Sequence, residues 1–230
     1  MPRTARIAPG GMVFHALNRA NAGVQIFDKD MDFVAFQRVL AEASEPSRMR
    51  ILGYTIMPNH WHLVLWPRED GDLARFMQRL TTTHVRRWHL HRGTVGLGHL
   101  YQGTYKSFPI QADEHLLVVL RYVERNALRA NLVKRAEAWR WSSLWRWRDP
   151  ELSHDNPLLC PWPIERPRDW LARVNRALTP AEIKAVRSSV NRGRPYGASI
   201  WQQRVAKRLG LESTFRSRGR PRKEKGDKSN

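Results

Sequence analysis

The sequence contains little cysteine and no long apolar run. Cys160 is the only cysteine among 230 residues, which excludes an internal disulfide and a metal cage built from several thiolates. No stretch approaches the ~18 apolar residues that span a bilayer, and the N-terminal residues MPRTARIAPGGMVF lack the apolar core of a signal peptide. We therefore expect a cytoplasmic protein that has no membrane partner.

Several signatures of catalysis are missing as well. The sequence has no GxSxG motif for a serine nucleophile, no Walker loop and no acidic cluster of the kind that holds two metal ions in nucleases. Tyrosine remains as a candidate nucleophile, and the chain has Tyr54, Tyr101, Tyr105, Tyr122 and Tyr196. Tyr101 and Tyr105 are also candidates for stacking on nucleic-acid bases, with ordinary packing as the alternative.

Acidic residues are scarce relative to basic ones. There are 21 Asp and Glu against 40 Lys and Arg, which gives a formal net charge of +19. Most of the basic residues are arginines, whose forked guanidinium suits phosphate contacts and stacking on bases. The charge favours a nucleic-acid partner over a merely solubilising surface, and it does not distinguish DNA from RNA.

Hydrophobic periodicity predicts an alternation of strands and helices. The predicted strands cover residues 12–17, 49–57, 60–66 and 105–110, and the predicted helices cover 30–44, 73–91 and 113–133, the last with Asp113 as N-cap. The first six elements follow the split βαβ order of a ferredoxin-like α+β domain with an antiparallel sheet. Pro109 favours an edge position for the last strand.

Composition divides the chain into three parts. Residues 1–148 hold the predicted ferredoxin-like domain, and residues 149–190 belong to a Trp- and Pro-rich stretch that we interpret as a packing or linker segment. Residues 191–230 carry 12 Lys and Arg against 3 Asp and Glu, a net charge of +9 (12 − 3). We predict that this last part is a basic DNA-binding tail.

The tail contains two Arg-Gly-Arg-Pro segments. The second, RGRPRK at 218–223, resembles an AT-hook, whose arginines lie in a narrow A·T-rich minor groove. Between the two segments, residues 198–216 loosely resemble a helix-turn-helix. A solvated basic tail that adds only non-specific affinity is the alternative.

The segment PNHWHLVLWP, residues 58–67, places two histidines at the start of a predicted strand. Because side chains alternate between the faces of a strand, His60 and His62 share one face and Trp61 lies on the other. Two neutral imidazoles side by side can hold one divalent ion, and two hydrogen-bonded histidines without a metal are the alternative. A metal site would need a third ligand from a neighbouring element.

A second constellation lies in LRYVERNALRA, on the helix predicted after Asp113. Tyr122 and Asn126 are four residues apart, hence about 40° apart around a helix, on the flank of its apolar stripe. One face therefore offers a phenol and an amide oxygen together, whereas Glu124 lies about 160° from Tyr122. A half-buried core tyrosine is the alternative explanation of Tyr122.

Four motifs in this order resemble the REP-associated tyrosine transposases, part of the single-tyrosine HUH nuclease group. The motifs are MPNHWHLVLW, GHLYQGTYKSF, LRYVERNALRANLV and WRWSSL. The segment FHALNRANAGVQIF resembles that family's opening strand and loop, and the similarity spans about residues 3 to 147. The family usually has proline after the asparagine of the third motif, where this chain has Ala127.

This resemblance implies a ferredoxin-like fold and assigns roles to four residues. Tyr122 would be the nucleophile and form a 5′-phosphotyrosine link, while His60, His62 and Asn126 would hold Mg²⁺ or Mn²⁺. The implied substrate is single-stranded DNA, often beside palindromic repeats that fold into hairpins. The implied activity is nicking and strand transfer in DNA transposition or in the processing of repeat hairpins.

Basic residues are the candidate contacts to the DNA backbone. They are Arg19, Lys106, Arg121, Arg125, Arg194, Arg218, Arg220 and Arg222. A non-catalytic, domesticated repeat-binding protein is the alternative function, and an RNA-processing enzyme is a third. The sequence favours neither a monomer nor a dimer.

Overall fold

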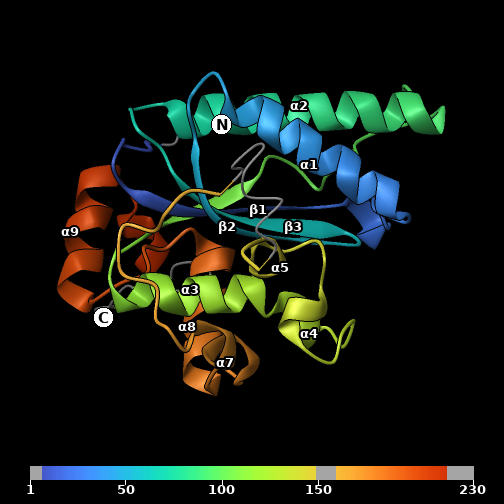
Figure 1. Ribbon diagram of the computed structural model, residues 1–230. Helices are drawn as coiled ribbons and strands as arrows, with labels where there is room; N and C mark the ends of the chain where they lie inside the picture. Colours follow the sequence, from blue (N-terminus) through green and yellow to red (C-terminus); the bar gives the residue numbers. More distant parts are fainter. Residues whose placement is uncertain (1–6, 149–158, 217–230) are drawn as a thin grey trace, which may run out of the picture.

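The computed structural model describes residues 7–148 and 159–216 (Figure 1). Four strands form one antiparallel sheet in the order β2-β3-β1-β4. The strands are β1 (Val13–Arg19), β2 (Arg50–Met57), β3 (His60–Trp66) and β4 (Lys106–Ile110). With helices α1 (Asp30–Ser44) and α2 (Asp72–Arg92), they confirm the predicted ferredoxin-like α+β arrangement, and β4 lies at an edge as Pro109 indicated.

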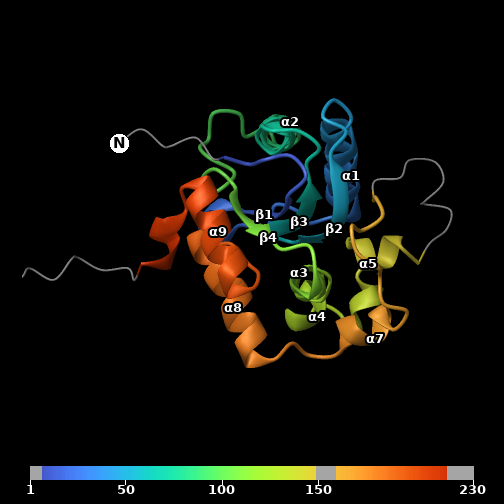
Figure 2. The ribbon, with the colours of Figure 1, turned by 90° about the vertical axis from the view of Figure 1, so that its left-hand side faces the viewer.

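Helices cover both faces of the sheet (Figure 2). α1 and α2 pack on one face, over a core that includes Phe36 and Phe76. α3 (Glu114–Glu124) packs on the other face, over Leu52 and Val64. Alternation along β3 sends the fully buried Trp61 into the first core and leaves the neighbouring histidines facing α3.

Helix α2 forms where apolar residues recur at helical spacing, and His84 extends its buried stripe. The Nδ1 atom of His84 lies 2.7 Å from the hydroxyl of Tyr101, which also accepts a hydrogen bond from Trp61 Nε1 at 2.9 Å. Tyr101 is only 6% exposed. Of the two roles considered for Tyr101, the structure shows the packing role.

The helix predicted over 113–133 is interrupted, which corrects the sequence interpretation. Asp113 caps α3 as expected, since its side chain accepts from the amide of His115, but α3 ends at Glu124 and a short helix α4 (Asn126–Arg129) follows. The buried carboxylate of Glu124 accepts from Ser143 Oγ at 2.6 Å and from Trp170 Nε1 at 2.7 Å. These tertiary contacts fix the last residue of α3, and helix periodicity in the sequence cannot predict them.

The C-terminal third packs against the domain. Its helices are α7 (Trp170–Asn175), α8 (Pro180–Arg192), α9 (Ser199–Leu209) and η3 (Glu212–Phe215). The short helices η1 (Asn21–Gly23), η2 (Ala136–Ala138) and α5 (Ser143–Arg146) lie earlier in the chain. Helix α8 crosses the predicted boundary at 190/191 and contacts β4. The amide of Tyr196 donates to Pro109 O at 2.9 Å and its carbonyl accepts from the amide of Gln111 at 2.9 Å. Tyr196 therefore extends the sheet edge beside β4, and Figure 2 shows α8 and α9 on this side of the sheet.

Candidate active site

A two-residue turn places His60 at the first position of β3. Met57 pairs with His60, so only Pro58 and Asn59 lie between β2 and β3. His60 Nδ1 is 2.7 Å from Asn59 Oδ1, and because an amide oxygen only accepts, His60 donates from Nδ1 and keeps the lone pair of Nε2. Burial, aided by the charges of Arg19 and Arg129, lowers the pKa of His60 to about 4. The ring is therefore neutral at physiological pH.

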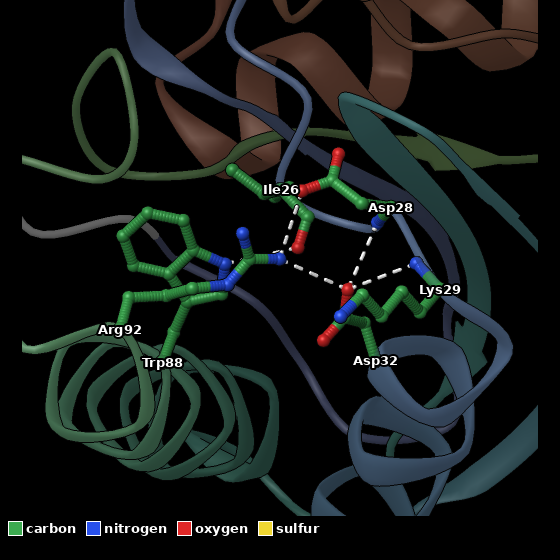
Figure 3. A network of polar contacts seen from close by, with 6 residues as sticks. All are labelled: Ile26, Asp28, Lys29, Asp32, Trp88 and Arg92. Carbon is green, nitrogen blue, oxygen red and sulfur yellow. Dashed lines mark hydrogen bonds and ion pairs between the residues drawn. The ribbon is translucent and has the colours of Figure 1, made fainter.

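A polar network supports the backbone behind this turn (Figure 3). The amide of Ile26 donates to Pro58 O at 2.8 Å, and Trp88 Nε1 donates to Ile26 O at 2.9 Å. Arg92, also on α2, donates to Asp32 of α1 at 3.0 Å. The segment that carries Ile26 is thereby fixed between α1 and α2, and it holds the turn that begins the histidine strand.

A third histidine, which the sequence analysis did not identify, orients His62. His15 of β1 lies with its Nε2 2.9 Å from His62 Nδ1. Both rings are buried, and burial lowers the pKa of His15 to about 3 and that of His62 well below its ordinary value. When His62 donates from Nδ1 to His15, its Nε2 keeps a lone pair, so Nε2 is the atom that both His60 and His62 could offer to a metal ion.

Tyr122 and Asn126 approach these histidines from α3 and α4. The Tyr122 ring lies 5.9 Å from the His62 ring, edge to face at 85°. The Nδ2 atom of Asn126 lies 3.5 Å from Nε2 of His60. The predicted phenol, amide and imidazole groups thus lie close together in space. They come from distant parts of the chain, since His62 and Tyr122 are 60 positions apart in the sequence (122 − 62).

Arg129 is a further residue that the sequence analysis missed. Its Nη2 donates to Asn126 Oδ1 at 2.5 Å, and its guanidinium carbon lies 4.8 Å from the centre of the Tyr122 ring. The same side chain therefore contacts both residues that the α3–α4 segment contributes. Residues three apart on a helix face one another, so the Asn126–Arg129 spacing was the signal available in the sequence.

These side chains line a cleft of about 580 Å³ whose charge is positive. Arg19, Lys106, Arg129 and Arg187 border it, and no Asp or Glu of the described residues does. The complete lining is Leu17, Asn18, Arg19, Met57, His60, His62, Gln102, Gly103, Thr104, Lys106, Tyr122, Asn126, Arg129, Ala130, Arg187, Val190 and Asn191. A basic cleft with neutral imidazoles and a phenol is suited to a phosphodiester.

Three of the other predicted basic contacts, Arg121, Arg125 and Arg194, do not line this cleft. Arg121 pairs with Glu182 at 3.0 Å, and Arg125 donates to two backbone carbonyls, those of Val174 and Asn175. Arg194 donates to Gln202 at 3.0 Å and lies over the Phe215 ring. Arg218, Arg220 and Arg222 lie outside the described residues.

The donor set around Nε2 of the two histidines fits a divalent ion with open coordination positions. The described residues contain no group of three His, Cys, Asp or Glu side chains that could hold a metal ion, so the third protein ligand would be the amide oxygen of Asn126. Each histidine has its Nδ1 engaged by a partner, Asn59 or His15, as metal-binding histidines usually do. Mn²⁺ accepts such mixed nitrogen and oxygen donors, and Mg²⁺ tolerates few protein ligands when phosphate oxygens complete its shell.

Comparisons with known proteins relate the chain to transposases. The family model described as "Transposase IS200 like" matches residues 10–126, just over half of the chain. The structure of a REP-associated tyrosine transposase bound to a REP hairpin superposes with a TM-score of 0.53 at 15% identity, covering 78% of this chain and 99% of that chain. The two proteins therefore share a fold.

A second solved structure superposes less well. It is assigned as a transposase from Deinococcus radiodurans R1 and is 19% identical, covering 54% of this chain and 96% of that chain, with a TM-score of 0.37 that supports no inference. No curated protein matches the chain. In the described part of the chain, no helix combines the length and apolarity that crossing a bilayer requires.

Proposed function

The chain belongs to the family of IS200-like transposases, and from this premise we propose that it nicks single-stranded DNA with Tyr122 and transfers the strand. His60, His62 and Asn126 would hold the metal ion, Mg²⁺ or Mn²⁺. The observation that carries the proposal is the convergence of these four side chains on one basic cleft. Such a reaction would serve DNA transposition or the processing of repeat hairpins.

The chemistry is a phosphoryl transfer to a phenol. Tyr122 Oη attacks the scissile phosphorus and loses its proton, and a phosphotyrosine bond forms. The bond between the phosphorus and the 3′ oxygen breaks, and that oxygen takes up a proton to give a 3′-OH. A bound divalent ion would polarise the phosphoryl group and stabilise the charge that develops on its oxygens. Because the phosphotyrosine conserves the energy of the broken bond, a 3′-OH can rejoin the strand without ATP.

The chain's own residues position this reaction. Asn59 and His15 fix the ring orientation of His60 and His62, respectively. Arg19 and Lys106 border the cleft and can contact phosphates on either side of the scissile one. Burial keeps the histidines neutral, and neutral imidazole is the form that ligates a metal.

DNA as the partner is supported by charge and by the fold. The net charge of +19 suits a polyanion, and the REP-associated transposase that shares the fold is bound to a REP hairpin. We propose a single-stranded DNA hairpin with unpaired flanks as the substrate of this chain.

Trapping the covalent intermediate tests the proposal. A pool of oligonucleotides with a fixed hairpin and random single-stranded flanks is incubated with the full chain and Mn²⁺, and the adduct is resolved on a denaturing protein gel. We expect an adduct with wild type and none with Tyr122→Phe, which should still bind the pool. Binding without any adduct in wild type would instead favour a non-catalytic repeat-binding protein. An adduct in Tyr122→Phe would place the nucleophile elsewhere, with Tyr105 tested next.

A further inference from the structure

The orientation of the Asn126 amide is opposite to the one that a metal ligand needs. Its Nδ2 faces the lone pair of His60 Nε2 at 3.5 Å, and its Oδ1 accepts from Arg129 at 2.5 Å. An amide nitrogen has no lone pair to give to a cation, so only Oδ1 can act as a ligand. In the structure that oxygen is engaged by Arg129, and the nitrogen is the amide atom that faces His60.

A turn of the amide would exchange its two ends. Oδ1 would then face the histidine nitrogens, and Nδ2 would face the guanidinium of Arg129. Since both Nδ2 and the guanidinium only donate, this pairing has no acceptor, and Arg129 would lose its partner on Asn126. The hydrogen bond that Arg129 makes in the structure is therefore lost when Oδ1 turns to face the histidine nitrogens.

The surroundings of Arg129 suit the binding of a phosphate by the released guanidinium. Its Nε is buried without a hydrogen-bond partner among the described residues, and the side chain lines the cleft beside Tyr122. A guanidinium that has lost an acceptor in such a place can bind a phosphate through two parallel hydrogen bonds. The nearest phosphate in the proposed reaction is the one that Tyr122 attacks.

We propose that Arg129 is a catalytic residue whose guanidinium is bound to Asn126 until a metal ion takes its place. Its guanidinium competes with a divalent cation for Asn126 Oδ1, and once displaced it binds the scissile phosphate beside Tyr122. The inference rests on the proposed function, because it takes Asn126 as a metal ligand and Tyr122 as the nucleophile. It couples two events, since the Asn126 oxygen becomes a ligand only as the guanidinium becomes available to the DNA.

Substitution of Arg129 should move metal binding and cleavage in opposite directions. We expect Arg129→Gln to bind Mn²⁺ about tenfold more tightly than wild type without DNA, because a charge-assisted hydrogen bond no longer competes for Oδ1. We expect the same variant to form the DNA adduct at least about tenfold more slowly, because the phosphate loses a charged contact. A merely structural role of Arg129 would weaken both. Arg129→Lys keeps the charge and should recover part of the adduct rate.

The experiment measures free Mn²⁺ by electron paramagnetic resonance on the full chain, and adduct formation with the hairpin pool. Arg173→Gln, which removes a partly exposed arginine from α7, is the matched control and should change neither quantity. Thermal unfolding checks that each variant is folded. Arg129→Gln with unchanged or weaker Mn²⁺ binding would overturn the competition, and an adduct rate within about twofold of wild type would overturn the phosphate role. Failure of the proposed function itself is seen separately, as wild type without an adduct or as His60→Ala binding Mn²⁺ like wild type.

Discussion

His15 Nε2 and His62 Nδ1 lie 2.9 Å apart, although the two residues are 47 positions apart in the sequence. His15 is fully buried beside Phe108, and its Nδ1 has no hydrogen-bond partner among the described residues. The one polar contact of its ring that the structure describes is thus with a predicted metal ligand. This arrangement indicates that His15 is present to orient His62.

The first prediction concerns that orientation. His15→Phe keeps an aromatic ring against Phe108 but cannot accept from His62, so we expect Mn²⁺ affinity to fall about 10- to 100-fold, as for other partners of metal-binding histidines. Titration of Mn²⁺ into the folded variant measures the effect. His99→Ala, at an exposed position, should not change the affinity. Equal affinities in wild type and His15→Phe would show that His15 only fills space.

The second prediction concerns pH and the network of Figure 3. Burial raises the pKa of Asp32, but hydrogen bonds from the backbone of Asp28 and Lys29 and the charge of Arg92 outweigh it, so the net pKa is below its ordinary value. A carboxylate with a depressed folded pKa stabilises the fold above its unfolded pKa near 4, and this contribution is lost as pH falls through the folded pKa.

We therefore expect the free energy of unfolding of wild type to decrease from pH 5 toward pH 3 (about the range of carboxylate titration), and Asp32→Asn to show a shallower decrease. Urea unfolding at each pH gives the two slopes. Asp30→Asn is the control, because the Asp30 side chain is 75% exposed, and it should keep the wild-type slope. Identical slopes for wild type and Asp32→Asn would contradict the assignment.

The third prediction concerns the tie between the Trp-rich segment and α3. Trp170→Phe removes the donor to the buried carboxylate of Glu124 and should destabilise the protein by about 1–3 kcal/mol beyond the loss of packing. Trp147→Phe is the matched control, since Trp147 Nε1 has no hydrogen-bond partner among the described residues. Chemical unfolding compares the two. A Trp170→Phe cost equal to that of Trp147→Phe would mean that the hydrogen bond contributes nothing net.

The fourth prediction concerns the basic tail. Tyr196 pairs with the end of β4, so deletion from 191 would remove a contact of the sheet edge, and the informative truncation removes residues 217–230. That segment carries 6 Lys and Arg against 2 Asp and Glu, a net charge of +4 (6 − 2). We expect the truncation to weaken DNA binding and reduce its salt dependence, because fewer counterions are released.

Substitution of the tail arginines separates the two predicted forms of tail. An AT-hook-like reader should lose a preference for A·T-rich DNA in Arg218→Ala/Arg220→Ala, whereas a merely charged tail has no preference to lose. Affinities for A·T-rich and G·C-rich duplexes of equal length give the comparison. Unchanged affinity and salt slope after the truncation would contradict both forms.

The sequence predicted the fold well where a signal is local. Strand alternation placed His60 and His62 on one face, and the four-residue spacing placed Tyr122 beside Asn126. The break between α3 and α4 was missed because it is associated with tertiary partners of Glu124, not with a Gly or Pro in the helix.

The missed site residues have similar explanations. Contact between His15 and His62 depends on the register of β1 against β3, which alternation alone does not fix. Arg121 and Arg125 stay predicted DNA contacts, and the structure adds that Arg121 pairs with Glu182 of α8 and that Arg125 donates to carbonyls at the end of α7. Charge composition shows how many basic side chains the protein has. It does not show which of them are paired with other groups of the protein.

The most direct test of the account is to identify the amino acid that carries the DNA. The covalent adduct formed with Mn²⁺ is digested with nuclease and trypsin, and the remaining nucleotide-modified peptide is sequenced by mass spectrometry. Cleavage after Arg121 and Arg125 isolates the peptide Tyr-Val-Glu-Arg, residues 122–125. The account predicts that Tyr122 in this peptide carries a nucleotide that is linked through its 5′-phosphate. A nucleotide on any other residue, or its attachment to Tyr122 in the presence of excess chelator, would contradict it.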